Sequence, residues 1–166
     1  MGMSDTDVTY VEKACAYVTR GGSELLTFEG PGHDGRQIPK GTVETGEEPR
    51  AALYREVIEE SGVATFHGVR HLATDVWVRR DDKRYVRHFY HVPVHEPRDA
   101  WTHVVTGEGA EVGAEFDFSW VDLSTVPDTA FALDLDDYVH ALAAVTGGKR
   151  GGPAAAAVAD DSLSSS

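Results

Sequence analysis

Residues 41–63 have the sequence GTVETGEEPRAALYREVIEESGV, and this stretch decides how the rest of the chain is organised. A proline near its middle, a run of helix-forming residues and a glycine near its end predict a helix over residues 49–61. On a helical wheel, one half of this segment is apolar. The apolar residues are Leu53, Tyr54, Val57 and Ile58. The other half is mostly acidic.

The acidic half places carboxylates on adjacent turns. Glu56 and Glu60 are one turn apart, and Glu59 lies beside them. Like charges at this spacing destabilise a helix by about 0.2–0.5 kcal/mol per pair. Arg55 offsets part of the repulsion, but a compact divalent cation such as Mg²⁺ fits better between the carboxylates, because hard cations prefer oxygen ligands. The alternative is a solvated helix face with no ligand.

The wider spacing favours the metal site. It follows G-x5-E-x7-R-E-U-x-E-E-x-G-U, where U is an apolar aliphatic residue, and every specified position is met. These positions are Gly41, Glu47, Arg55, Glu56, Val57, Glu59, Glu60, Gly62 and Val63. This pattern is the Nudix box, so the chain resembles the Nudix hydrolases, more loosely over residues 12–145. The resemblance predicts an α/β fold, the Nudix α/β/α sandwich, with a mixed β-sheet between the box helix and a C-terminal helix.

The resemblance also implies an activity: metal-dependent hydrolysis of a diphosphate linkage by attack of water on phosphorus. By position, Glu56 and Glu60 match the principal ligands of Mg²⁺ or Mn²⁺, and Glu59 matches a further ligand. A backbone carbonyl of Lys40 or Gly41 completes the expected metal site.

Two more residues of the box have an expected catalytic role through the same resemblance. Arg55 and Glu47 match an ion pair that fixes the loop against the helix. A further carboxylate, acting as ligand or base, is expected near the strand that contains Trp120. Glu115 is the first candidate and Glu111 the second.

Candidates for substrate binding lie outside the acidic residues. Lys40 directly precedes the box and can meet a phosphate as a point charge. Arg87 falls within a predicted strand and is a pocket candidate. Phe28 and Tyr85 are candidates for stacking on a nucleobase.

The chain is expected to divide into three parts. Residues 1–10 form a flexible N-terminus, residues 11–146 the Nudix domain, and residues 147–166 a disordered tail without apolar periodicity. Within the domain, the pattern predicts a hairpin around Gly21 and Gly22, and an active-site floor formed by it. Further elements are strands over residues 68–79, 85–94 and 116–121, a loop over 101–113 and an amphipathic helix over 134–145.

Composition limits the partners. The formal net charge of −13 argues against a general nucleic-acid surface or an anionic membrane, but suits a metal-dependent enzyme whose anionic substrate arrives with its cation. The small nucleotide or polyphosphate substrate is what the resemblance implies. Cys15 is the only cysteine, which excludes an intramolecular disulfide and favours a cytoplasmic location. No apolar run approaches a membrane span. A homodimer is left open.

Other functions on the same fold stay open from the sequence. A catalytically silent nucleotide sensor usually lacks box carboxylates, whereas all are present here. An isopentenyl-diphosphate-isomerase-like enzyme needs a cysteine in its pocket, and Cys15 is poorly placed for this. The substrates left open are nucleoside triphosphates, nucleotide sugars, dinucleoside polyphosphates and inositol pyrophosphates.

Overall fold

Strand β1 (Thr9–Arg20) runs through the centre of the fold in the computed structural model, which describes residues 7–31 and 34–143. Its side chains alternate between two apolar layers, because successive residues of a strand point to opposite faces of a sheet. Ala14, Ala16 and Val18 face one layer, and Cys15 and Tyr17 face the other. All five side chains are buried, so this part of β1 is covered on both faces.

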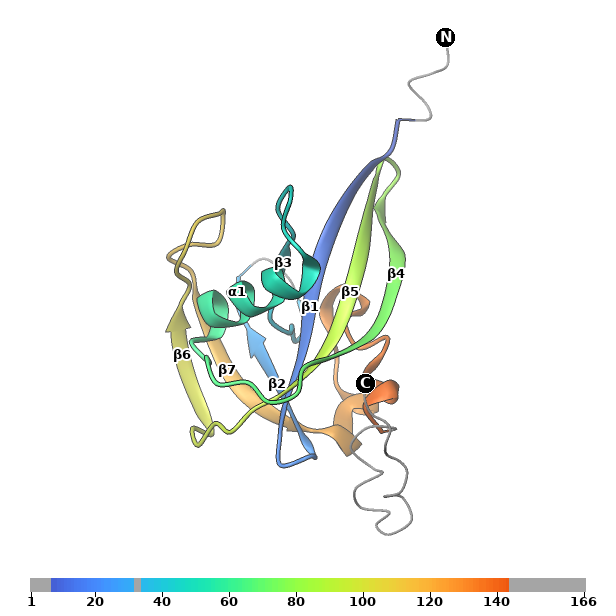
Figure 1. Ribbon diagram of the computed structural model, residues 1–166. Coiled ribbons are helices and arrows are strands. Elements are labelled where there is room, and N and C mark those ends of the chain that lie inside the picture. The colour runs from blue at the N-terminus through green and yellow to red at the C-terminus, as the bar shows by residue number, and fades with distance from the viewer. Residues whose placement is uncertain (1–6, 32–33, 144–166) are drawn as a thin grey trace.

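The sheet has seven strands in the order β4-β5-β1-β2-β7-β6, and β3 pairs with β1 (Figure 1). β1 runs parallel to β5, whereas the other strand pairs are antiparallel, so the sheet is mixed as predicted. The remaining strands are β2 (Glu24–Glu29), β3 (Lys40–Thr42), β4 (Arg70–Arg80), β5 (Lys83–Pro93), β6 (Ala100–Val104) and β7 (Glu115–Asp122).

Helix α1 (Pro49–Ser61) covers one face of the sheet and has the predicted bounds. It ends where Gly62 takes up a left-handed conformation with φ 81° and donates its N–H to the carbonyl of Ile58. The buried face differs from the predicted apolar half. Ile58 is 42% exposed, whereas Glu60 is buried at the end of a row that begins with Leu53 and Val57. The buried face of the helix therefore includes one carboxylate, that of Glu60, which points toward the sheet.

The opposite face is covered by 3-10 turns, and the amphipathic helix predicted over residues 134–145 is wrong for residues 134–141, whereas residues 142 and 143 are helical. The turns are η2 (Leu123–Asp128), η3 (Ala132–Asp134) and η4 (Val139–Ala141). Leu133 and Asp134 have φ values of 55° and 54°, which interrupt a right-handed helix. The expected apolar residues still pack on the sheet: Leu135, Val139 and Leu142 are buried.

Strand boundaries differ from the expectations in three places. Thr9 and Tyr10 belong to β1, although residues 1–10 were expected to be flexible. β6 lies within the segment expected to be a loop, and the short β3 was not predicted. The expected tail, residues 147–166, lies outside the described residues. Within residues 7–31 and 34–143, no helix combines the length and apolar character needed to cross a membrane.

Candidate functional site

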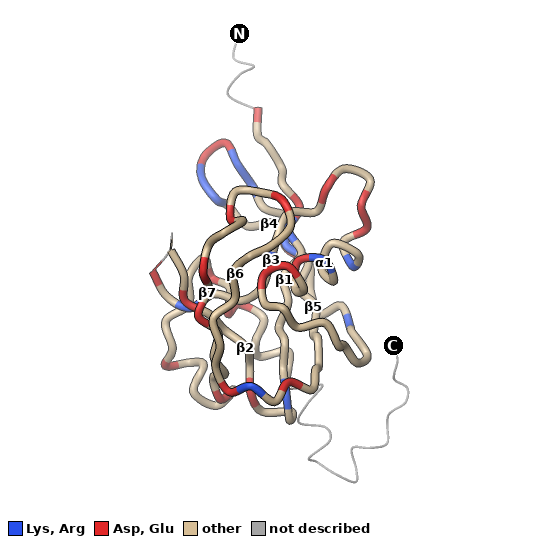
Figure 2. The backbone as a smooth tube through the Cα atoms, turned by 90° about the vertical axis from the view of Figure 1, so that its left-hand side faces the viewer, with Lys and Arg blue, Asp and Glu red and all other residues tan. Residues whose placement is uncertain are grey.

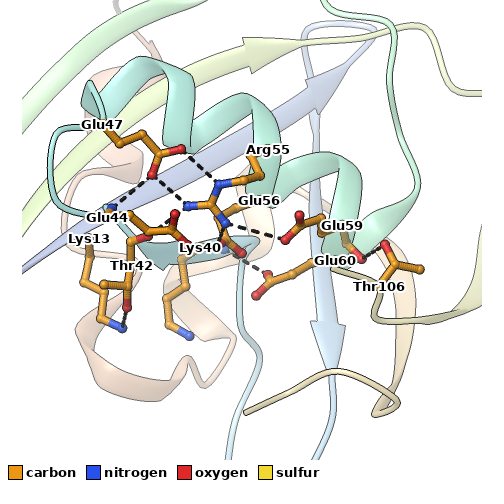
Figure 3. Close-up of polar contacts among 10 residues, drawn as sticks. All are labelled: Lys13, Lys40, Thr42, Glu44, Glu47, Arg55, Glu56, Glu59, Glu60 and Thr106. Atoms are coloured by element: carbon orange, nitrogen blue, oxygen red, sulfur yellow. Dashed lines mark hydrogen bonds and ion pairs between the residues drawn. The ribbon is translucent and has the colours of Figure 1, made fainter. Parts of the chain in front are cut away.

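The loop before α1 is held to the helix by the predicted ion pair (Figure 3). Arg55 donates from Nε and Nη2 to the two carboxylate oxygens of Glu47, at 3.0 and 2.9 Å. Its Nη2 also donates to the carbonyl of Thr42 at 3.0 Å, and Glu47 accepts the N–H of Glu44. The Arg55 guanidinium holds the pKa of the Glu47 carboxyl below its ordinary value. The predicted contact between Arg55 and Glu47 is present.

Arg55 also neutralises the acidic face of the helix. Its Nη1 lies 2.7 Å from Oε2 of Glu56 and 3.5 Å from Oε1 of Glu59. With the contact to Glu47, one guanidinium therefore meets three carboxylates. The repulsion expected from the sequence is offset from within the helix.

Glu60 is the most enclosed of the acidic residues, with 2% of its surface exposed. One carboxylate oxygen, Oε1, accepts the backbone N–H of Lys40 at 3.0 Å. The other oxygen has no hydrogen-bond donor within residues 7–31 and 34–143. Burial raises the pKa of Glu60 well above its ordinary value, because a charged carboxylate loses its hydration there. A buried carboxylate oxygen without a donor is stabilised by a cation.

Two glycines make room for the carboxylates. A Cβ atom on Gly41 would overlap the carboxyl group of Glu56, and a Cβ atom on Gly107 would overlap that of Glu59. Gly107 has φ +90°, a conformation that favours glycine. The requirement at Gly41 is for space, since its φ lies outside the left-handed region.

The carboxylates line a cavity of about 410 Å³ between α1, β3 and the loop after β6. This carboxylate cavity is lined by Lys13, Lys40, Gly41, Thr42, Glu44, Arg55, Glu56, Glu59, Glu60, Val105, Thr106 and residues 108–112. The loop is held to the helix where Thr106 donates its N–H to the carbonyl of Glu59 at 3.1 Å. Glu111 is part of the lining, whereas Glu115 is exposed on β7 and is not. Of the two candidate bases, the structure thus brings Glu111 to the site.

Beside this cavity lies a smaller opening, the aromatic crevice. It is lined by Lys13, Cys15, Lys40, Trp77, Tyr85, Arg87, Leu133 and Leu135. The rings of Trp77 and Tyr85 are stacked with centroids 5.9 Å apart. The contact of Tyr85 with a substrate stays a prediction, and Lys13 and Lys40 line both openings.

Two predicted substrate contacts are corrected by burial. Phe28 is 1% exposed and stacks on Phe116 at 4.2 Å, so its ring is part of the core and cannot stack on a nucleobase. Arg87 is also buried, and protein acceptors take all of its N–H donors. Arg87 forms part of the crevice wall and does not present a free donor to a phosphate.

Sequence reasoning missed Lys13. Its position becomes significant because β1 and β3 pair in a register that places Lys13 opposite Thr42 and Cys15 opposite Lys40. Since β3 was not predicted, nothing in the sequence pattern placed Lys13 beside the box. The alternation along β1 predicts which face of the sheet Lys13 lies on. Its neighbours follow only from the pairing of β1 with β3.

The acidic residues fit a hard divalent ion by their donor chemistry. Within the described chain, no group of three or more His, Cys, Asp or Glu side chains is arranged as a preformed metal site. Glu56 and Glu59 instead turn toward Arg55. The unpaired oxygen of buried Glu60 and the carboxylates that share its cavity are oxygen donors of the kind that hard divalent ions prefer.

A mixed sheet carrying an acidic loop and helix over a carboxylate-lined cavity defines a Nudix-type α/β/α sandwich. A family model described as the NUDIX domain matches residues 9–142, and the chain belongs to this family.

Several proteins are similar to this chain. An RNA pyrophosphohydrolase of Psychrobacter sp. is 48% identical over 69 residues, which are 41% of this chain and 40% of that relative. One of Psychrobacter cryohalolentis is 45% identical over 66 residues, covering 39% and 38%. The chain thus spans about 40% of the length of these curated relatives.

Solved structures of low sequence identity share the fold. The MutT protein of Methanosarcina mazei superimposes with a TM-score of 0.61 at 14% identity, over 84% of this chain and 96% of that one. A NUDIX hydrolase of Nitrosomonas europaea gives 0.60 at 16% identity, over 82% and 90%.

Proposed function

We propose that the protein is a divalent-metal-dependent pyrophosphohydrolase. It cleaves a phosphoric anhydride linkage in a nucleoside diphosphate derivative or polyphosphate by attack of water on phosphorus. The observation that carries the proposal is the buried Glu60, whose unpaired carboxylate oxygen belongs to the same cavity as Glu56 and Glu59.

The carboxylates and Arg55 have distinct parts in this proposal. Glu56, Glu59 and Glu60, with the carbonyl of Gly41, would hold Mg²⁺ or Mn²⁺, which neutralises phosphate charge and lowers the pKa of bound water. Arg55 and Glu47 keep the loop and helix in register. Glu111, on the cavity wall, is the candidate general base that accepts a proton from the attacking water.

Several phosphate compounds are candidate substrates. Nucleoside triphosphates, dinucleoside polyphosphates and nucleotide sugars all contain the linkage. The similarity to proteins named RNA pyrophosphohydrolase adds the 5′-phosphorylated end of RNA. Acidic residues on the loops around α1 do not favour an extended nucleic-acid contact (Figure 2), so only the phosphorylated end of an RNA is expected to enter.

A substrate panel tests the activity. Phosphate or pyrophosphate release would be measured from each compound class with Mg²⁺ or Mn²⁺, and again after chelation. We expect at least one class to turn over and the rate to vanish with the chelator. Binding of nucleotides without turnover of any compound would instead favour the catalytically silent sensor.

Substitution of Gly41 by alanine tests the fit around Glu56. The added Cβ would overlap the Glu56 carboxyl group, which must move. Since a displacement of about 1 Å at a reacting centre can cost about 100-fold, we expect turnover to fall by roughly 10- to 100-fold. Steady-state kinetics measure the effect.

Gly46→Ala is the matched control. Gly46 has φ +81° and open space around it, so alanine there should reduce stability by about 1 kcal/mol without moving a carboxylate. Equal loss of turnover in both variants would contradict the specific role of the space at Gly41.

A further inference from the structure

Two lysines from neighbouring strands end beside the carboxylate cavity. Lys13 of β1 and Lys40 of β3 are diagonal neighbours on the same face of the sheet, because Lys13 pairs with Thr42 and Cys15 with Lys40. Figure 3 shows the two side chains side by side, both extending away from α1. Both line the carboxylate cavity and the aromatic crevice, so they stand where the two openings meet.

Neither ammonium group lies within ion-pair distance of a carboxylate of the described residues. Lys13 Nζ donates to the hydroxyl of Thr42 at 2.9 Å and lies 4.9 Å from the centre of the Tyr85 ring. Lys40 Nζ donates to the side-chain oxygen of Gln37 at 3.4 Å. Within residues 7–31 and 34–143, neither lysine forms an ion pair.

The missing carboxylate partner is significant because Lys13 is partly buried in an acidic protein. Burial is the main cause that lowers the pKa of its ammonium group. Tyr85 opposes this shift, the charge of Lys40 adds to it, and Cys15 and Glu111 oppose it with smaller effects. A desolvated ammonium group is stabilised when an anion approaches it. Glu56 and Glu59 face Arg55, and Glu111, whose charge acts on Lys13, forms no ion pair with it.

We propose that Lys13 and Lys40 form an anion subsite for a phosphate group beyond the two that share the scissile linkage. This inference rests on the proposed function. A substrate with three or more consecutive phosphates would extend from the carboxylate cavity to the two ammonium groups, whereas a diphosphate joined to a sugar would leave them unpaired. The subsite therefore selects the polyphosphate class, which includes nucleoside triphosphates, dinucleoside polyphosphates and triphosphorylated RNA ends.

The test compares chain lengths in one protein. Adenosine triphosphate and diadenosine tetraphosphate represent the longer chains, and ADP-ribose the two-phosphate compounds. Lys13→Met keeps the aliphatic stem and removes the charge. We expect KM for the longer substrates to rise by about 10- to 100-fold, as for the loss of a charged hydrogen bond, with little change for ADP-ribose. Lys13→Arg, which keeps the charge, should recover most of the loss.

Lys83→Met is the matched control. Lys83 also lies near the Tyr85 ring, at 6.0 Å, but lines neither opening. Lys83→Met removes the same charge from a position outside the proposed subsite. It should therefore leave KM for both substrate classes unchanged. If it raised KM as much as Lys13→Met, or if Lys13→Met affected both substrate classes equally, the subsite would be refuted.

A binding measurement separates this inference from the proposed function. Titration calorimetry would compare tripolyphosphate with pyrophosphate on the wild type and on Lys13→Met, without added metal. We expect tighter binding of tripolyphosphate to the wild type, and loss of that preference in Lys13→Met. If no compound is hydrolysed, the proposed function fails while this preference still tests the subsite. Turnover with no preference for longer chains would overturn the subsite alone.

Discussion

Replacement of Glu60 by glutamine is expected to lower turnover by about 100- to 1,000-fold and leave the chain folded. Metal-assisted charge stabilisation is worth several kcal/mol, and each 1.36 kcal/mol is about tenfold in rate. Glutamine keeps the size of the side chain and an oxygen that can accept the N–H of Lys40. It removes the negative charge that a metal ion requires. Steady-state rates at saturating Mg²⁺ measure the loss.

The same variant should be at least as stable as the wild type without metal. Burial raises the pKa of Glu60, so its charged form is disfavoured in the folded state, and the charges of Glu111 and Glu56 add to this effect. A neutral amide removes the penalty. Thermal unfolding with a chelator present compares the stability of the variant with that of the wild type. Glu48→Gln is the control, because this residue precedes α1 and its side chain caps nothing. Turnover of Glu60→Gln within a few-fold of wild type would contradict the role of the carboxylate.

The local part of the site was predictable from the sequence. Pro49 and Gly62 set the bounds of α1 through backbone preferences that act over single residues. The contact between Arg55 and Glu47 was implied by the resemblance to the Nudix box and is present at 2.9 Å. These features depend on residues close together in the chain, so a pattern of short range is enough to predict them.

Features that depend on tertiary packing were not predictable. Glu56 and Glu60 share one acidic helix face in the sequence pattern and both line the cavity, but packing encloses Glu60 against Lys40 whereas Glu56 pairs with Arg55. Phe28 was a candidate for base stacking because its side chain is aromatic, but it lies in the core beside Phe116. Residues 134–145 have helical apolar spacing, yet at the start of this segment the carbonyls of Leu133 and Asp134 accept hydrogen bonds from Arg87 on a distant strand.

The network around Arg87 joins the second face of the sheet to the turns that cover it. Arg87 donates to both carboxylate oxygens of Asp75, at 2.9 and 2.6 Å, and to Asp137 at 3.0 Å. Its Nη1 donates to the carbonyls of Leu133 and Asp134 at 3.2 and 3.3 Å. These two residues have positive φ, so one guanidinium satisfies a backbone turn that is otherwise unfavourable.

Arg87→Met is therefore expected to destabilise the chain by about 3 kcal/mol, which corresponds to a fall in Tm of roughly 6–12 °C. The Arg87 side chain is 2% exposed, and its loss leaves Asp75 without its cation and the Leu133 carbonyl without a donor, whereas the Asp134 carbonyl keeps the N–H of Asp137. Thermal and urea unfolding measure the change.

Two further variants define the cause. Asp137→Asn removes one contact to a side chain that is 44% exposed, and should cost less than about 1 kcal/mol. Asp75→Asn combined with Arg87→Met should recover part of the loss, because the unpaired carboxylate is then gone. Two results would contradict the role of the network in holding the turns: an Arg87→Met variant with the same Tm as the wild type, or a double variant less stable than Arg87→Met alone. Since Arg87 offers no free donor to a substrate, a folded Arg87→Met should keep its turnover below the melting range.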